Sequence, residues 1–319
     1  CAETLAGHGR VIWNGKLIGD VDTATETGRV LADENPDCVV IFTSIAVFGG
    51  IPWAAIKQLR APVLIWNAQT INRVGHGYNM VELVRNVQPD TVMHLASLFL
   101  GEHQPGDVDD LIASNVLLST QLAEAMAANE VQLLINVGTS WQHHEDGGAP
   151  AMVNLYAATK QAYRSILRYY IETANLKVIN LELFDTYGPN DQRGKLFALL
   201  DRLRTSGDTL AMSPGDQQLD PVYIDDVSEA FIAALKRLRS DVVQDEETYS
   251  VRSQNPIKLK DLVKTYEDAT SSTLNIEWGG RPYRAREVMV PWSRGETLPG
   301  WSSTVTLQEG IKRILDSDV

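Results

Sequence analysis

The sequence predicts an α/β protein, with a doubly wound, Rossmann-like parallel sheet and a smaller C-terminal α/β lobe that binds substrate. In the first part of the chain, short apolar runs alternate with amphipathic stretches of helical period, as in βαβ units. The run at 133–137 is apolar apart from Asn136, which is typical of a parallel strand covered on both faces. After Gly188 the alternation gives way to a polar region with frequent Gly and Pro, which favours a separate lobe.

Each apolar run predicts one strand, and the stretch that follows it predicts one helix. Strands are expected at 10–14, 38–43, 63–67, 91–95, 133–137 and 178–183. Helices are expected at 22–35, 53–60, 79–87, 108–128 and 153–174. A further helix is expected to begin within the segment 221–227, and another at 307–315. The crossovers between parallel strands should be right-handed.

The composition is that of an ordinary soluble enzyme, with 319 residues of which 44% are hydrophobic and 22% charged. The formal net charge of −13 argues against nucleic acid and against anionic membrane surfaces, because both attract Lys and Arg. A phosphate-bearing ligand would therefore need a local group of basic residues.

Targeting signals and metal sites are not expected. The two cysteines, Cys1 and Cys38, form neither a disulfide framework nor a zinc-binding pair. No apolar run is long enough to span a membrane, and no signal-peptide pattern is present. We therefore expect a cytoplasmic protein. Because the chain begins with Cys rather than Met, we also expect it to lack the first residues of its natural start.

Tyr156 and Lys160 are the most informative pair of residues, because a spacing of four places them on one face of a helix. A phenol that exchanges its proton near neutral pH needs a fixed cation beside it. The spacing alone is weak evidence, since an isolated match is usually a surface pair. The preceding strand, however, ends in Thr139, and the carboxyl ends of parallel strands are where ligands bind.

Four motifs follow one another in a specific order: the strand ending in Thr139, the helix with Tyr156 and Lys160, a strand running into 184–189, and the segment 223–227. This order resembles the extended short-chain dehydrogenase/reductase family, and within it the nucleotide-sugar epimerases, dehydratases and 4-ketoreductases. The segments 138–142, 155–160 and 183–189 look most like the CDP-abequose and CDP-paratose synthase branch. The resemblance runs from about residue 90 to the C-terminus.

The resemblance implies an NAD(P)-dependent enzyme that acts on a nucleotide-activated sugar. Residues 1–187 with 221–250 would form the dinucleotide-binding domain, and residues 188–220 with 251–319 the substrate lobe. Tyr156 would protonate a sugar carbonyl oxygen as hydride arrives, while Thr139 would hydrogen-bond the same oxygen. Lys160 would lower the pKa of the phenol and hold the nicotinamide ribose. Other residues implied to line the cofactor are Leu95, Ala96, Ser97, Tyr187, Gly188 and Pro189.

The glycine-rich turn of a dinucleotide site is incomplete. In the preferred register the first strand is 10–14, and Gly15 and Gly19 form a shortened turn. In the other register the strand is 39–43 and only Gly50 matches. The second strand ends without the acidic residue that usually binds the NAD ribose, and no Arg follows to bind a 2′-phosphate. The choice between NAD and NADP therefore stays open, as does a loss of dinucleotide binding.

Substrate phosphates should be bound by cations of the C-terminal half. The candidates are Arg193, Lys195, Arg281 and Arg284, with Arg286 close to the last two and with Trp278 and Tyr283 nearby. Arg suits bidentate binding of a diphosphate, and an aromatic ring can stack on a base. A solvated basic face is an equally good interpretation of each of these residues.

Weaker candidates are interpreted mainly as structural. We expect Asn115 to bridge backbone groups. His143 and His144, in a polar loop, are expected to be solvated. Asp225 and Asp226 are expected to be carboxylates at a helix N-terminus.

The leading hypothesis is a 4-ketoreductase. The runner-up is a 4-epimerase with tightly bound NAD, and the rival from another class is a sugar-nucleotide-binding protein without a dinucleotide site. The family resemblance also implies a homodimer formed by the helices at 108–128 and 153–174. Their periodicity would suit packing on the chain's own sheet equally well.

Overall fold

The structure is a computed structural model that describes residues 88–144, 150–189, 191 and 195–317, with Arg29, 39–43, 63–67 and 84–85. It divides into two compact units. The first contains Cys1–Leu134 and Tyr163–Lys177, and the second contains Ile135–Ala162 and Val178–Val319. The predicted division into a dinucleotide-binding domain and a substrate lobe stays a prediction.

The first unit contains a parallel pair of strands, β1 (Val39–Thr43) and β2 (Val63–Asn67), at the predicted positions. A third strand, β3 (Thr91–His94), is one residue shorter than predicted. The expected strand at 10–14 lies outside the described residues, as does the expected helix at 53–60. The expected helices at 22–35 and 79–87 are described only at Arg29 and at 84–85, which are helical.

A long helical stretch, Pro105–Ala128, follows β3. It consists of a 3₁₀ turn (Pro105–Asp107), α5 (Val108–Ile112), a π turn (Ala113–Leu117) and α6 (Leu118–Ala128). The helix begins three residues before the prediction because Gln104 and Asp107 form a reciprocal capping box around Pro105.

We expected no apolar run long enough to span a membrane, but Pro105–Ala128 has the length and composition to do so, and it is the single such helix within the described part of the chain. Two polar side chains of this helix contact residues that come shortly before it in the chain. Asn115 is buried and bonds both backbone groups of Leu98, with the amide nitrogen of Leu98 2.7 Å and its carbonyl oxygen 2.9 Å away. Ser119 contacts Nε2 of His94 at 2.8 Å. Asn115 therefore has the structural role that was expected.

The second unit is built around parallel strands in the order β10-β5-β4. These are β4 (Leu133–Thr139), β5 (Lys177–Leu183) and β10 (Glu246–Val251), with Val178 of β5 opposite Glu246 of β10. Residues 134–139 of β4 are all buried, as expected of a strand covered on both faces. Helix α7 (Leu155–Ala174) follows β4 along the chain, and its first residues belong to this unit.

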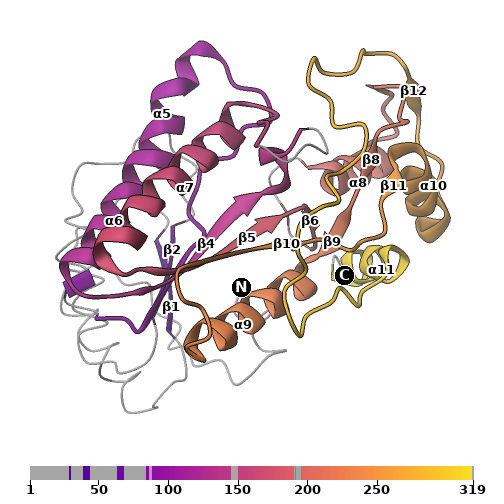
Figure 1. Cartoon of the computed structure of the whole chain (residues 1–319). Helices are drawn as coiled ribbons and strands as arrows, with labels where there is room; N and C mark the ends of the chain where they lie inside the picture. The colour runs from indigo at the N-terminus through magenta and orange to yellow at the C-terminus, as the bar shows by residue number, and fades with distance from the viewer. Residues whose placement is uncertain are drawn as a thin grey trace. The chain divides into compact units, whose positions relative to one another are not determined.

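The C-terminal half of the second unit contains its own helices and short strands (Figure 1), which enclose a hydrophobic core. Helices α8 (Leu196–Ser206), α10 (Leu259–Thr270) and α11 (Leu307–Ser317) supply most of it. Short strands pair around them: β6 (Asp185–Tyr187) with β9 (Pro221–Tyr223), β7 (Leu210–Met212) with β12 (Ile276–Trp278), and β8 (Gln218–Leu219) with β11 (Ile257–Lys258). The core residues are Leu200, Leu203, Met212, Leu259, Leu262, Val263, Tyr266, Leu274 and Ile311.

Helix α9 (Ile224–Arg239) begins where the segment 221–227 predicted a helix. Asp225 and Asp226 lie in its first turn, as expected, but they differ in environment. Asp225 makes a half-exposed ion pair with Arg313. Asp226 is buried, and its carboxylate accepts hydrogen bonds from the backbone of Thr304 and Val305 at 3.1 and 3.0 Å. Asp226 thereby anchors the segment that leads into α11.

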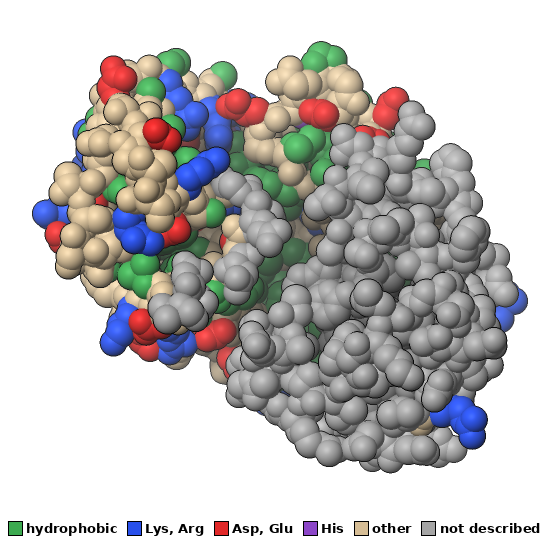
Figure 2. All heavy atoms as spheres, turned by 180° about the vertical axis from the view of Figure 1, so that it is seen from behind, with side chains coloured by type: hydrophobic (Ala, Val, Ile, Leu, Met, Phe, Trp, Pro, Cys, Tyr) green, Lys and Arg blue, Asp and Glu red, His purple; other side chains and the backbone are tan. Residues whose placement is uncertain are grey.

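On the described part of the face shown in Figure 2, acidic and basic side chains are interspersed and do not form separate acidic and basic patches. The negative net charge of the chain is therefore compatible with local groups of basic residues.

Candidate functional site

Thr139 ends β4, where the chain turns into the short 3₁₀ helix Ser140–Gln142. Its backbone nitrogen donates to Oε1 of Gln142 at 3.0 Å, and its hydroxyl accepts from the nitrogen of Trp141 at 3.3 Å. Only 8% of Thr139 is exposed. These reciprocal bonds form a capping box that holds the threonine in extended backbone at the edge of the sheet.

Helix α7 carries Tyr156 and Lys160 one turn apart, and both belong to the same unit as Thr139. Tyr156 is 8% and Lys160 4% exposed, so they are not a solvated surface pair. The start of the helix is held by Asn154, whose side chain accepts from the nitrogen of Ala157 at 3.0 Å. The helical face predicted from the spacing is therefore a buried face.

Gln142 joins the end of β4 to this helix. While its Oε1 accepts from Thr139, its Nε2 donates to Oε1 of Gln161 at 2.8 Å, next to Lys160. Gln142 is itself 1% exposed, so both hydrogen bonds lie away from water. Losing either bond would leave a buried polar group without a partner, which destabilises the fold. This bridge links the element that carries Thr139 with the element that carries Tyr156 and Lys160.

The ammonium of Lys160 is in an unusual environment. Burial lowers the pKa of Lys160 from 10.5 to about 8, and no hydrogen bond or neighbouring charge in the described residues offsets that effect. A buried donor of this kind is suited to the hydroxyls of a bound ribose, which accept hydrogen bonds. The residues present therefore fit a nicotinamide ribose at this position.

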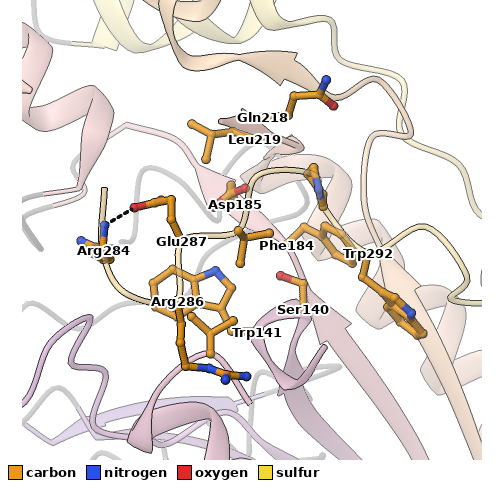
Figure 3. Close-up of a pocket in the computed structure, with 13 residues that line it drawn as sticks. Ser140, Trp141, Phe184, Asp185, Gln218, Leu219, Arg284, Arg286, Glu287 and Trp292 are labelled. Carbon is orange, nitrogen blue, oxygen red and sulfur yellow. Dashed lines mark hydrogen bonds between the residues drawn. The ribbon is translucent and has the colours of Figure 1, made fainter. Parts of the chain in front are cut away.

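A pocket in the same unit lies beside the end of β4 (Figure 3). Trp141 and Arg286 lie on one side of the view, Gln218 and Leu219 on the opposite side, and Asp185 and Phe184 between them. The remaining lining residues are Ser140, Val153, Arg284, Glu287, Val288, Pro291 and Trp292. The pocket thus combines two guanidinium groups with aromatic and aliphatic walls.

Asp185 is the ionisable group in the middle of this pocket. Burial raises its pKa, and the nearby carboxylate of Asp220 raises it further. Two other groups lower the pKa of Asp185. The backbone N–H of Asp220 donates a hydrogen bond to Oδ2 of Asp185 at 3.2 Å, and the positive charge of Lys195 lies nearby. The ammonium of Lys195 donates to the carbonyl of Thr186 at 3.4 Å.

Not all of the cations that were predicted to bind substrate line this pocket. Arg284 lines the pocket, while Arg281 and Lys195 are described but are not among its lining residues. Arg193 lies outside the described residues. Arg286, which the sequence placed near the candidates, also lines the pocket, and its exposed side chain is available to a ligand.

Of the predicted cofactor-lining residues, Gly15 and Gly19 lie outside the described residues. Leu95, Ala96 and Ser97 follow β3 in the first unit. Tyr187 is buried and stacks on Phe197, with ring centroids 4.4 Å apart, and burial raises its pKa. Gly188 has a packing role, because a Cβ atom there would lie 2.6 Å from Cγ2 of Ile224. Pro189 follows Gly188 and is half-buried.

The expectation that His143 is solvated is wrong. Its side chain is 11% exposed, Nε2 lies 3.1 Å from Oε2 of Glu182, and its ring stacks on Trp292. The adjacent His144 is also half-buried. Sequence spacing could not show this, because Glu182 and Trp292 come from distant parts of the chain. No cluster of three or more potential metal ligands is found in the described part of the chain.

The chain matches, over residues 70–251, the sequence model of the NAD dependent epimerase/dehydratase family. It belongs to this family. A CDP-abequose synthase of Yersinia pseudotuberculosis is 32% identical over 67% of this chain and 72% of that protein. A second CDP-abequose synthase, from Salmonella muenchen, is 26% identical over 70% and 75%. Membership shows that the protein is an enzyme of an NAD-dependent family, which confirms the predicted family and cofactor class.

Solved structures confirm the fold class. The UDP-glucuronic acid 4-epimerase from Bacillus cereus, in complex with UDP-glucuronic acid and NAD, superposes with a TM-score of 0.71 at 19% identity. The match covers 92% of this chain and 94% of that one. A UDP-glucose 4-epimerase of Thermus thermophilus in complex with NAD has a TM-score of 0.67 at 19% identity, covering 94% and 96%. The Rossmann-like parallel sheet is thus shared with these enzymes.

Replacing the buried ammonium should stabilise the ligand-free protein. We expect Lys160→Met to raise the free energy of unfolding at pH 7 by about 3 kcal/mol, because a charge no longer has to be desolvated. Between pH 8 and 10.5 the unfolded wild type binds more protons than the folded one. Wild-type stability therefore rises with pH there, and the advantage of the variant shrinks.

Urea unfolding between pH 7 and 10.5 measures this effect. Lys264→Met, at a side chain that is 74% exposed, is the matched control and should show no such pH dependence. A Lys160→Met protein that is less stable than the wild type at pH 7 would contradict the desolvation argument.

Proposed function

We propose that the protein is an NAD(P)-dependent oxidoreductase that reduces the 4-keto group of a nucleotide-activated sugar. The observation that carries the proposal is the burial of Thr139, Tyr156 and Lys160 in one compact unit, on two elements that Gln142 links through its bonds to Thr139 and Gln161. The family assignment supplies the class of reaction, and these residues supply groups that hold the carbonyl and move a proton.

The nicotinamide, when bound, supplies the hydride. The hydroxyl of Tyr156 protonates the sugar oxygen, and the hydroxyl of Thr139 donates a hydrogen bond to the same oxygen and stabilises its developing charge. A donor of this kind contributes about 3 kcal/mol in known enzymes. The ammonium of Lys160 holds the ribose hydroxyls and favours the phenolate of Tyr156 electrostatically. Above a pH of about 8, Lys160 loses its charge in the free enzyme, and this assistance declines.

The substrate we infer is a nucleoside diphosphate sugar that occupies the pocket beside β4. Arg284 and Arg286 can each bind diphosphate oxygens, and the aromatic residues offer faces for a base. The chain's likeness to two CDP-abequose synthases supports a cytidine nucleotide. Ser140, Trp141 and Val153, which adjoin the catalytic segments in sequence, would then face the sugar.

A 4-epimerase is the second candidate function. It is favoured by the likeness to UDP-glucuronate 4-epimerases, one of which, from Thermodesulfobacterium geofontis, is 24% identical over 64% of this chain. An epimerase returns its hydride to the opposite face of the sugar and so keeps NAD tightly bound. Nicotinamide that co-purifies with the protein would favour the epimerase. An NADPH absorbance change that depends on a 4-keto sugar nucleotide would favour the reductase.

Tyr156→Phe should abolish turnover while leaving sugar-nucleotide affinity nearly unchanged, because only the transferred proton is removed. NADPH consumption and calorimetric binding measure the two effects. Tyr163→Phe is the matched control on the same helix. Tyr163 is 1% exposed, its hydroxyl has no hydrogen-bond partner in the described part of the chain, and burial raises its pKa. Normal turnover by Tyr156→Phe would refute the catalytic assignment.

Arg286→Ala should weaken binding of a CDP-sugar about tenfold or more, because a charge-assisted contact to the diphosphate is lost. Arg281→Ala removes the same charge outside the pocket lining and should have a smaller effect. Calorimetry at fixed ionic strength gives both affinities. Equal losses in the two variants would show that the pocket does not bind the diphosphate.

We also propose that the protein acts in the cytoplasm as a homodimer through Pro105–Ala128 and α7. Large apolar side chains are exposed on these helices, including Ile112 (44%), Leu117 (50%) and Tyr169 (61%). Ile112→Asp should therefore shift the mass measured by light scattering from dimer to monomer. Val242→Asp, at an exposed apolar residue elsewhere, should not. A monomeric wild type would contradict the proposal.

A further inference from the structure

The loop after β4 contains an ionisable group, His143, that the proposed reaction does not use. Its Nε2 lies 3.1 Å from Oε2 of Glu182, and the glutamate side chain is 1% exposed. A carboxylate this far from solvent is costly unless a donor or a positive charge compensates it. His143 is such a partner, at the point where the chain leaves the strand that carries Thr139.

The other contact of His143 is with Trp292. The two rings lie parallel, with centroids 3.6 Å apart and an interplanar angle of 9°. Such a stack buries one face of each ring and fixes the plane of the indole against the imidazole. His143 therefore contacts the buried carboxylate through Nε2 and the indole through the face of its ring.

Two further features fix the residues around this stack. A Cβ atom on Gly138 would lie 3.1 Å from Cγ of Glu182, so the glycine provides the space in which the glutamate side chain lies. The guanidinium of Arg252 donates to the carbonyl oxygens of Trp292 and Ser293 at 3.3 and 2.9 Å. The backbone of Trp292 is thus held by Arg252, and its ring by His143.

Trp292 is also a lining residue of the pocket that contains Arg284 and Arg286 (Figure 3). We propose that the hydrogen-bonded pair Glu182–His143 is a positioning device that fixes Trp292 as a wall of the nucleotide-binding pocket. His143 and Glu182 then act on substrate affinity through Trp292, without touching the reacting atoms. This inference rests on the proposed function, because it assumes that the pocket binds a nucleoside diphosphate.

Calorimetry with CDP as the probe tests the proposal. His143→Phe keeps an aromatic ring but removes the contact with Glu182, and it should weaken CDP binding about tenfold, the size of a lost hydrogen bond. It should raise KM for the nucleotide sugar by a similar factor and leave kcat unchanged. His143→Arg keeps a planar donor to Glu182 and should retain affinity within about threefold. Wild-type affinity in His143→Phe, or a fall in kcat alone, would overturn the proposal.

A second readout needs no ligand. A histidine ring stacked on an indole quenches its fluorescence, whereas a phenyl ring does not, so His143→Phe should be brighter than the wild type. Introducing Trp292→Phe into both backgrounds should remove that difference. Adding Glu182→Gln to His143→Phe should restore part of the CDP affinity, because the buried carboxylate that has lost its contact with His143 is replaced by an amide. If wild-type CDP binding is absent, the nucleotide assignment of the pocket fails. Unchanged fluorescence in His143→Phe would overturn the stack itself.

Discussion

A desolvated ammonium on α7 is the feature on which the rest of the site depends. Burial lowers the pKa of Lys160 to about 8, and nothing in the described residues offsets this cost. A protein selected for stability alone would not keep a charge in such a place, but active sites often do, because function outweighs the loss. The free energy lost by burying this ammonium is consistent with a ligand whose oxygen atoms accept hydrogen bonds from Lys160 when it binds.

The elements around Lys160 are connected by side chains that bridge them. Gln142 links the backbone of Thr139 to Gln161, and Gly138 leaves the space that Glu182 needs to reach His143. The short segment that follows β4 thus serves two purposes. It orients the residues assigned to the chemistry, and it connects with the pocket in which the nucleotide is proposed to bind.

Much of the fold could be predicted because apolar runs and helical periodicity are local signals. Strands β1 and β2 are confirmed within one residue at each end, and α7 within two. The start of the helical stretch at Pro105 was missed because it depends on a capping box rather than on periodicity. The short strands β7, β8, β11 and β12 were not predicted, since two or three residues carry too little pattern.

The candidate site, too, could be predicted only where the signal lies within one short stretch of the sequence. Tyr156 and Lys160 share a helix, so their common face followed from spacing. Thr139 followed from its place at the carboxyl end of a predicted strand, and the family resemblance added its role. The pocket could not be predicted as a whole, because Trp141, Gln218 and Trp292 come from separate segments without any fixed spacing. The partners of His143 are equally distant in the chain, which is why the interpretation of this residue as solvated was wrong.

The central claim is that hydride reaches a sugar carbonyl held by Thr139 and Tyr156. Reduction of a 4-keto CDP-sugar with NADPH that carries two deuterium atoms at the nicotinamide C4 position tests it most directly. The account predicts that deuterium appears at C4 of the sugar, detected by NMR of the product. A product without deuterium, or a label at another carbon, would contradict it.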